Sequence, residues 1–293
     1  MCYLRGIFLA LLHLACQEEN KMKKNTLALC EGGIMIAIST VLAMLKIADM
    51  PVGGSVTFAQ MLPIIIFAYR HGAGYGMGAS LIASLIQLLL GLDNFSYISP
   101  VWYAVLALAL LDYVVAYSAF GIVGFFKNKL NYKKAMLLGA VISSVIRYLC
   151  HFISGFTVWT GFELPTGAGL IYAAGYNAIY MIPETIVLVA ATYYICSAID
   201  FSKEVPTRAK NTVGDSNLEL LRILSGIAVF IAIIVDIALI FPNLQNKETG
   251  EYFTTSGLAN VNWTAFAIVT VVCIGAAIIL RVVEKRNKHT PNN

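Results

Sequence analysis

The feature that most restricts the fold of this chain is a series of apolar segments, most of them long enough to cross a lipid bilayer. A membrane-spanning helix needs about 20 mostly apolar residues. Such segments recur along the whole chain, at residues 27–46, 58–70, 73–90, 101–126, 135–160, 168–198, 218–241 and 262–283. Only 12% of the 293 residues are charged, about half the share in an ordinary soluble domain. The sequence therefore predicts an all-α, polytopic membrane protein.

The basic residues between these segments predict how the helices are oriented. Cytoplasmic loops of membrane proteins carry an excess of Lys and Arg. The segment 58–70 is short, but the basic turn Arg70-His71-Gly72 separates it from 73–90. If the two are counted as separate helices, every basic cluster lies on one side. We therefore expect eight helices with both termini in the cytoplasm, and no binding of nucleic acid.

Two polar stretches divide the chain. The first, an N-terminal extension at residues 1–26, contains a short apolar run that resembles a weak signal peptide without a cleavage site. We favour the alternative that translation starts at Met22. The second, a cytoplasmic linker at 200–216, separates a six-helix membrane domain at 27–199 from a two-helix C-terminal segment at 217–293.

Polar side chains within the apolar segments indicate where a site lies. Ionisable residues are costly inside a membrane, so each is a functional hypothesis by default. Apart from Asp236, all such polar residues lie in the first six segments: Glu31, Gln60, Gln87, Asp112, Arg147, His151, Asn177 and Glu184. We therefore expect a ligand site in the six-helix domain.

The segment 135–160 carries the clearest pattern. Arg147, His151, Gly155 and Trp159 recur every four residues, which places them in one helical stripe about 120° wide. This stripe combines a cation, an imidazole, a gap for close approach and an indole, so it is expected to face the protein interior. Two alternatives stay open: His151 bonds a neighbouring carbonyl group, or Trp159 belongs to an aromatic belt at the membrane interface.

Two neighbouring segments add complementary polar groups. Asp112 lies mid-segment and needs a cationic partner, either Arg147 or a ligand. Asn177 offers two donors and an acceptor, which suits a heterocycle with amino and ring-nitrogen groups. Glu184 follows Pro183, so it either contributes to the site or bonds backbone groups that the proline leaves free. With Tyr and Trp nearby, this pattern indicates a site for a flat aromatic cation.

Residues 27–197 resemble a known family, the thiamine-specific substrate-binding subunits (S-components) of energy-coupling factor transporters. The motifs that carry the resemblance are LDYVVAYSAFGIVG at 111–124, RYLCHFISG at 147–155 and YNAIYMIPE at 176–184, with two flanking stretches at 50–57 and 62–72. The last two segments have no counterpart in that six-helix family.

The resemblance implies six helices around a bound vitamin, thiamine, with no cofactor and no enzymatic activity. The implied ligand contacts are Trp102, Asp112, Tyr113, His151, Gly155, Trp159, Tyr172 and Asn177. Arg147 and Glu184 would support the pocket, with Arg147 paired to a pocket carboxylate. The loop at 50–57 would act as a lid.

The implied partners are a transmembrane coupling protein and two ATPase subunits. The chain contains no Walker A motif of its own, so ATP hydrolysis must come from such partners. Gly33 and Ala37 are small residues four positions apart, a spacing that permits close helix contact, and they match the docking face of the family. Two alternatives remain: an S-component for another vitamin, or a membrane enzyme using His151 and a carboxylate, against which stands the lack of HExxH and GxSxG motifs.

Overall fold

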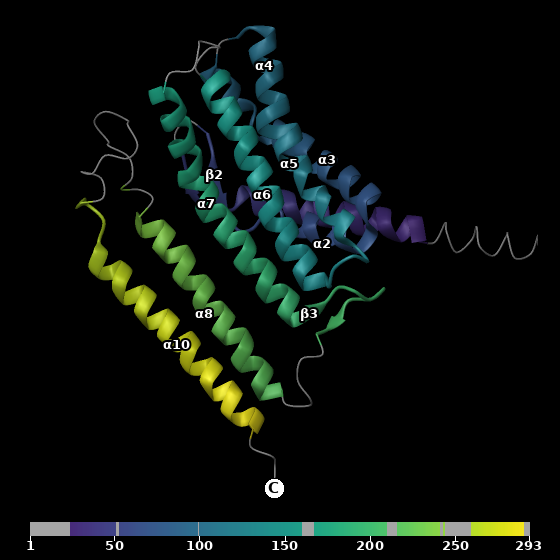
Figure 1. Ribbon diagram of the computed structural model, residues 1–293, viewed down its shortest axis with the longest axis vertical. Helices are drawn as coiled ribbons and strands as arrows, with labels where there is room; N and C mark the ends of the chain where they lie inside the picture. Colours follow the sequence, from purple (N-terminus) through teal and green to yellow (C-terminus); the bar gives the residue numbers. More distant parts are fainter. Residues whose placement is uncertain are drawn as a thin grey trace, which may run out of the picture.

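A computed structural model of the chain describes residues 24–50, 53–98, 100–159, 167–209, 216–240, 243 and 259–289, and most of these residues are helical (Figure 1). Among them, six helices are long and apolar enough to cross a membrane. This confirms the prediction of an all-α polytopic membrane protein. The interpretation of residues 1–23, including the translation start at Met22, lies outside the described residues.

The helices follow the apolar segments closely. They are the first helix (Lys24–Met44), α2 (Leu62–His71), α3 (Ala73–Leu90), α6 (Tyr132–Thr157), α7 (Gly167–Ala198), α8 (Ser216–Ile240) and α10 (Trp263–His289). A further helical rod joins α4 (Trp102–Leu108), the π-helical stretch η2 (Ala109–Val115), α5 (Ala116–Ser118) and the 3₁₀ stretch η3 (Ala119–Phe126). A short 3₁₀ helix, η1 (Leu92–Tyr97), precedes this rod.

Two short antiparallel hairpins interrupt the helical pattern. Strands β1 (Lys46–Asp49) and β2 (Ser55–Thr57) pair after the first helix. Strands β3 (Ile199–Asp200) and β4 (Thr207–Arg208) pair where the six-helix domain meets the linker. Both hairpins lie at turns between helices, so the membrane-crossing elements themselves remain helical.

The helix α2 is shorter than the apolar segment from which it was expected, 58–70. It contains ten residues, which rise about 15 Å, roughly half the thickness of the hydrocarbon core. Eight of these residues are buried, because α2 packs within the bundle rather than against lipid. The helix expected at 58–70 therefore exists, but it is shorter than a full span and is not among the six long apolar helices of the described residues. The expected location of both termini stays a prediction.

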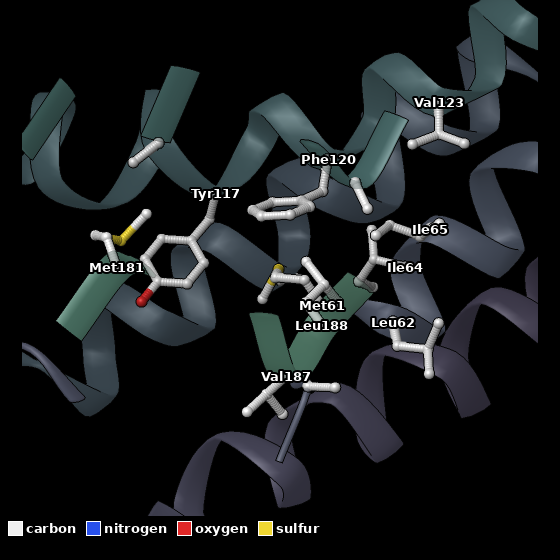
Figure 2. Close-up of a cluster of buried hydrophobic side chains, with 14 of the residues drawn as sticks. Met61, Leu62, Ile64, Ile65, Tyr117, Phe120, Val123, Met181, Val187 and Leu188 are labelled. Atoms are coloured by element: carbon white, nitrogen blue, oxygen red, sulfur yellow. The ribbon is translucent and has the colours of Figure 1, made fainter. Parts of the chain in front are cut away.

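The core of the six-helix domain forms around α2. Figure 2 shows Met61, Ile64 and Ile65 between Phe120 from the α4–η3 rod and Val187 from α7. All five side chains are at most 1% exposed. This packing fixes the relative positions of the helices that surround the cavity described below.

A polar cluster at the other end of α2 ties together segments that are far apart in the sequence. Arg70 donates to both carboxylate oxygens of Glu31 on the first helix, at 2.5 and 3.0 Å, and to the carbonyl oxygens of Lys203 and Glu204 in the linker. Lys127 donates to the carbonyl oxygen of Arg70, and burial, together with the Arg70 charge, lowers the pKa of Lys127. The charge of Glu31 therefore helps to hold the first helix against the end of α2.

The C-terminal helices α8 and α10 form an antiparallel pair that packs against α7 (Figure 1). Thr270 on α10 donates to Asp236 on α8 at 2.7 Å, which links the two helices through a polar contact. The helices α7 and α8 approach closely at Gly226, where a Cβ atom would lie 2.5 Å from Cδ1 of Tyr194. By contrast, a Cβ atom at Gly275 on α10 would meet no described atom within 4 Å.

We predict that Gly226→Val destabilises the protein while Gly275→Val leaves it unchanged. A side chain at Gly226 must push α8 away from α7, at a cost of about 1–3 kcal/mol for overpacking. The midpoint of thermal unfolding in detergent should therefore fall only for Gly226→Val. Replacing Tyr194 by Ala in the Gly226→Val background should restore part of the loss. Equal midpoints for the two glycine variants would contradict the close packing of α8 on α7.

Candidate ligand-binding site

A cavity of about 640 Å³ lies within the six-helix domain. The described residues that line it fall between positions 43 and 180, and they come from the first helix, the β1–β2 hairpin, α3, η1, the α4–η3 rod, α6 and α7. Its volume is in the usual range of about 300–1,000 Å³ for small-molecule sites. The helices expected to hold the site thus enclose one common cavity.

Asp112 forms the polar centre of this cavity. It is 8% exposed and lies in the π-helical stretch η2, a distortion of the helix that is frequent at functional sites. Its Oδ1 lies 2.9 Å from Nδ1 of His151, and its Oδ2 accepts from Oγ of Ser154 at 2.9 Å and from Nε1 of Trp159 at 3.3 Å. Because three donors surround it, the carboxylate is held in a fixed position.

Arg147 reaches this centre through His151 rather than directly. Its Nε donates to Nε2 of His151 at 3.3 Å. A guanidinium group can only donate, so Nε2 of His151 accepts, and the proton on Nδ1 of the ring is available for Asp112. The structure therefore shows a chain of contacts from Arg147 through His151 to Asp112, and His151 bonds a carboxylate rather than a backbone carbonyl group.

The guanidinium of Arg147 has further partners. Its Nη2 donates to the hydroxyl oxygen of Tyr117 at 2.8 Å, and the guanidinium carbon lies 4.4 Å from the centre of the Tyr117 ring. Its Nη1 lies 3.7 Å from Oε1 of Glu184. Arg147 is therefore paired with the buried carboxylate of Glu184, which is not among the residues that line the cavity. Tyr117 was missed from the sequence, although it lies four residues after Tyr113 and so on the same helix face.

Asn177 and Gly155 form a close contact between α6 and α7. Nδ2 of Asn177 donates to the carbonyl oxygens of His151 and Ala173 at 3.2 and 2.9 Å, and Oδ1 accepts from the hydroxyl of Tyr180 at 2.7 Å. A Cβ atom at Gly155 would lie 3.1 Å from this Nδ2. Both residues line the cavity, but the two N–H donors expected to serve a ligand already bind protein carbonyl groups.

Aromatic side chains form much of the remaining wall. Tyr113 lines the cavity, and its hydroxyl donates to the carbonyl oxygen of Gly91 at 3.0 Å and accepts from Asn94 at 2.7 Å. Trp159 lines the cavity, and its ring lies 6.5 Å from that of Tyr97. Tyr172 also lines the cavity but is 58% exposed.

Trp102 is the one proposed contact that the structure does not bring to the cavity. It is 76% exposed at the start of α4 and packs edge-on against Tyr103. Its position is ten residues before Asp112, and the direction of a side chain so far along the rod depends on the π-helical stretch between them. We therefore omit Trp102 from the site.

The β1–β2 hairpin, which we call the lid, closes one side of the cavity. Its turn includes Gly53 and Gly54, with φ values of 91° and 97° that glycine adopts without strain. The hydroxyl of Tyr176 on α7 donates to the carbonyl oxygen of Gly53 at 3.0 Å. Residues 51–52, part of the lid expected at 50–57, lie outside the described residues.

Glu184 holds the other end of the lid. Its carboxylate accepts from the backbone N–H of Thr57 at 2.6 Å and from the Thr57 hydroxyl at 2.9 Å. Sequence reasoning left open whether Glu184 serves the site or bonds backbone freed by Pro183. The structure shows a backbone contact, but with a strand 127 residues away.

The expected docking face on the first helix is open. Gly33 and Ala37 are both exposed, and a Cβ atom at Gly33 would meet no described atom within 4 Å. Another helix can therefore approach here closely. The described residues that line the cavity all belong to the six-helix domain.

The fold and the cavity together define an α-helical, multi-pass membrane protein with an internal polar binding site. A family model described as "Thiamine transporter protein" matches residues 29–202, and the chain belongs to this family. It is also similar to the thiamine transporter ThiT of Bacillus subtilis (strain 168), with 35% identity over 177 residues, or 56% of this chain and 87% of the relative. The family match ends before α8 begins.

Proposed function

We propose that this chain is the substrate-binding subunit of a vitamin uptake transporter and that its ligand is thiamine. The observation that carries the proposal is the buried carboxylate of Asp112 at the centre of a cavity lined by aromatic residues. Thiamine combines an aminopyrimidine with a permanently charged thiazolium ring. A buried carboxylate offsets such a charge, while tyrosine and tryptophan faces attract cations and stack on flat rings.

The chain acts without chemical conversion of its ligand. Under this proposal, a transmembrane coupling protein docks on the first helix around Gly33 and Ala37, and two ATPase subunits supply the energy. The open small-residue face supports the docking part of the proposal. Both termini face the cytoplasm, as the distribution of basic loops indicates.

Titration of the purified, ligand-free protein tests the substrate. Thiamine should bind with an affinity well above that of riboflavin, biotin or folate, and it should be identified by mass spectrometry when the protein is purified from cells supplied with it. Tight binding of a different vitamin would contradict thiamine as the substrate but would still support a vitamin-binding subunit. Conversion of the ligand by the isolated chain would contradict a non-enzymatic role.

A pair of tryptophan variants tests the position of the ligand. Trp159 lies in the cavity wall and Trp102 outside it, so thiamine should quench the fluorescence of Trp159 only. Trp159→Phe is expected to remove most of the quenching and to weaken binding about tenfold, because ring stacking and cation attraction are worth about 0.5–2 kcal/mol. Trp102→Phe should leave both unchanged. Loss of quenching in Trp102→Phe alone would place the ligand elsewhere.

A further inference from the structure

We propose that Glu184 is the positioning residue that latches the lid over the cavity, and that Arg147 makes this latch respond to the charge of the ligand. The response to charge rests on the proposed function, because it requires a cationic ligand at Asp112. The latch itself rests only on the contacts between α7 and β2.

The latch consists of a buried, charge-assisted contact. Glu184 and Thr57 are 3% and 1% exposed. The carboxylate receives two hydrogen bonds from Thr57, the final residue of β2, at 2.6 and 2.9 Å. Hydrogen bonds to a charged acceptor are roughly twice as strong as neutral ones. The bond from Tyr176 to Gly53 at the turn of the lid is neutral, so Glu184 is the stronger of these two attachments to α7.

Arg147 connects this latch to the ligand centre. It is 3% exposed and lies between Glu184, at 3.7 Å, and the His151 ring that bonds Asp112. The guanidinium of Arg147 therefore lies beside the carboxylate of Glu184 and is linked to that of Asp112 through His151. The distance from Arg147 to Glu184 exceeds that of a direct hydrogen bond, so these two side chains can move closer together.

A cation bound at Asp112 changes this balance. It neutralises Asp112, which leaves Glu184 as the uncompensated anion beside Arg147. Charges interact strongly in a buried site, so Arg147 and Glu184 draw together and hold the lid strand more firmly. Since coupling between two sites is reciprocal, a firmly latched lid in turn retains a cation better than a neutral molecule of the same shape.

Glu184→Gln in the full-length protein tests the latch and its dependence on charge. Glutamine keeps the shape but removes the negative charge. The dissociation rate should be measured for thiamine and for a neutral isostere in which carbon replaces the thiazolium nitrogen. We expect a rise of about tenfold to a hundredfold for thiamine, from the loss of bonds to a charged acceptor, and a rise at least about threefold smaller for the isostere. Equal rises in the dissociation rates of thiamine and the isostere would overturn the role of Arg147. Unchanged dissociation rates for both ligands would overturn the latch.

Two further variants serve as comparisons. Thr57→Val removes the hydroxyl bond but keeps the bond from the backbone N–H, so its effect on the thiamine dissociation rate should be smaller than that of Glu184→Gln. Glu204→Gln makes the same substitution at an exposed linker position remote from the cavity, and its dissociation rate should match that of the parent. An effect of Glu204→Gln equal to that of Glu184→Gln would overturn the specific role of Glu184.

Hydrogen exchange in the ligand-free protein separates this inference from the proposed function. The Thr57 amide should be protected in the parent and should exchange at least about tenfold faster in Glu184→Gln, while amides in α3 remain unchanged. If the parent binds no thiamine, the proposed function fails, and this measurement still decides the latch. Unchanged exchange at Thr57 would overturn it.

Discussion

Asp112→Asn will weaken thiamine binding by about two to three orders of magnitude. The substitution keeps the size of the side chain but removes the negative charge that faces the ligand. It also turns one oxygen into an N–H donor in a site where His151, Ser154 and Trp159 already donate. Removing one partner of a buried, hydrogen-bonded charge pair costs about 2–5 kcal/mol, and each 1.4 kcal/mol is a factor of ten in affinity. Isothermal titration of the purified variant measures the loss.

Asp236→Asn is the matched control for this experiment. Asp236 is also an acidic residue within a helix, but it bonds Thr270 in the C-terminal pair and does not line the cavity. Its replacement should leave the thiamine affinity unchanged. The neutral isostere should lose less affinity than thiamine in Asp112→Asn. Tight thiamine binding by Asp112→Asn would show that the ligand charge is balanced by another group.

Arg147→Met will destabilise the folded protein by about 3–5 kcal/mol, the usual cost of removing one partner from a buried ion pair. Methionine fills a similar volume but leaves Glu184, whose side chain is 4% exposed, without its cation. It also removes the donor that orients His151. The midpoint of thermal unfolding, measured in detergent without ligand, should fall strongly.

Two comparisons make this second prediction specific. The double variant Arg147→Met with Glu184→Gln should recover part of the lost stability, because it no longer leaves a buried carboxylate without a cation. Lys46→Met breaks an ion pair with Asp49 whose side chains are 48% and 55% exposed, and such pairs contribute about 0–1 kcal/mol. If the midpoint of thermal unfolding fell as far for Lys46→Met as for Arg147→Met, burial of the ion pair would not explain the loss of stability.

Some features of the site were predictable because they depend on local spacing. The four-residue spacing of Arg147, His151 and Gly155 places them on one face of α6 whatever surrounds the helix, and Trp159 continues the series just beyond the end of the helix at Thr157. The cost of a carboxylate in lipid likewise requires Asp112 to face the protein interior. Both arguments need only the helical period and the apolar composition, and the structure brings these residues into one cavity.

Other features depend on contacts between distant segments. The partner of Glu184 is Thr57, 127 residues away, and no local pattern indicates this pairing. The amide of Asn177 binds carbonyl groups because α6 and α7 approach closely at Gly155. The outward position of Trp102 follows the course of a rod that contains a π-helical stretch, whose extra residue per turn shifts the faces of the helix.

The sequence by itself determined the class of this protein: an all-α membrane protein whose polar residues gather in the six-helix domain. Long apolar runs and a helical period leave few other folds open to such a chain. Only the tertiary structure decided that α2 is a buried helix of ten residues, and that Arg147 stands between two carboxylates. The physical reason is that apolar length and helical spacing are local properties, whereas burial and the choice of charge partners arise only when distant helices pack together.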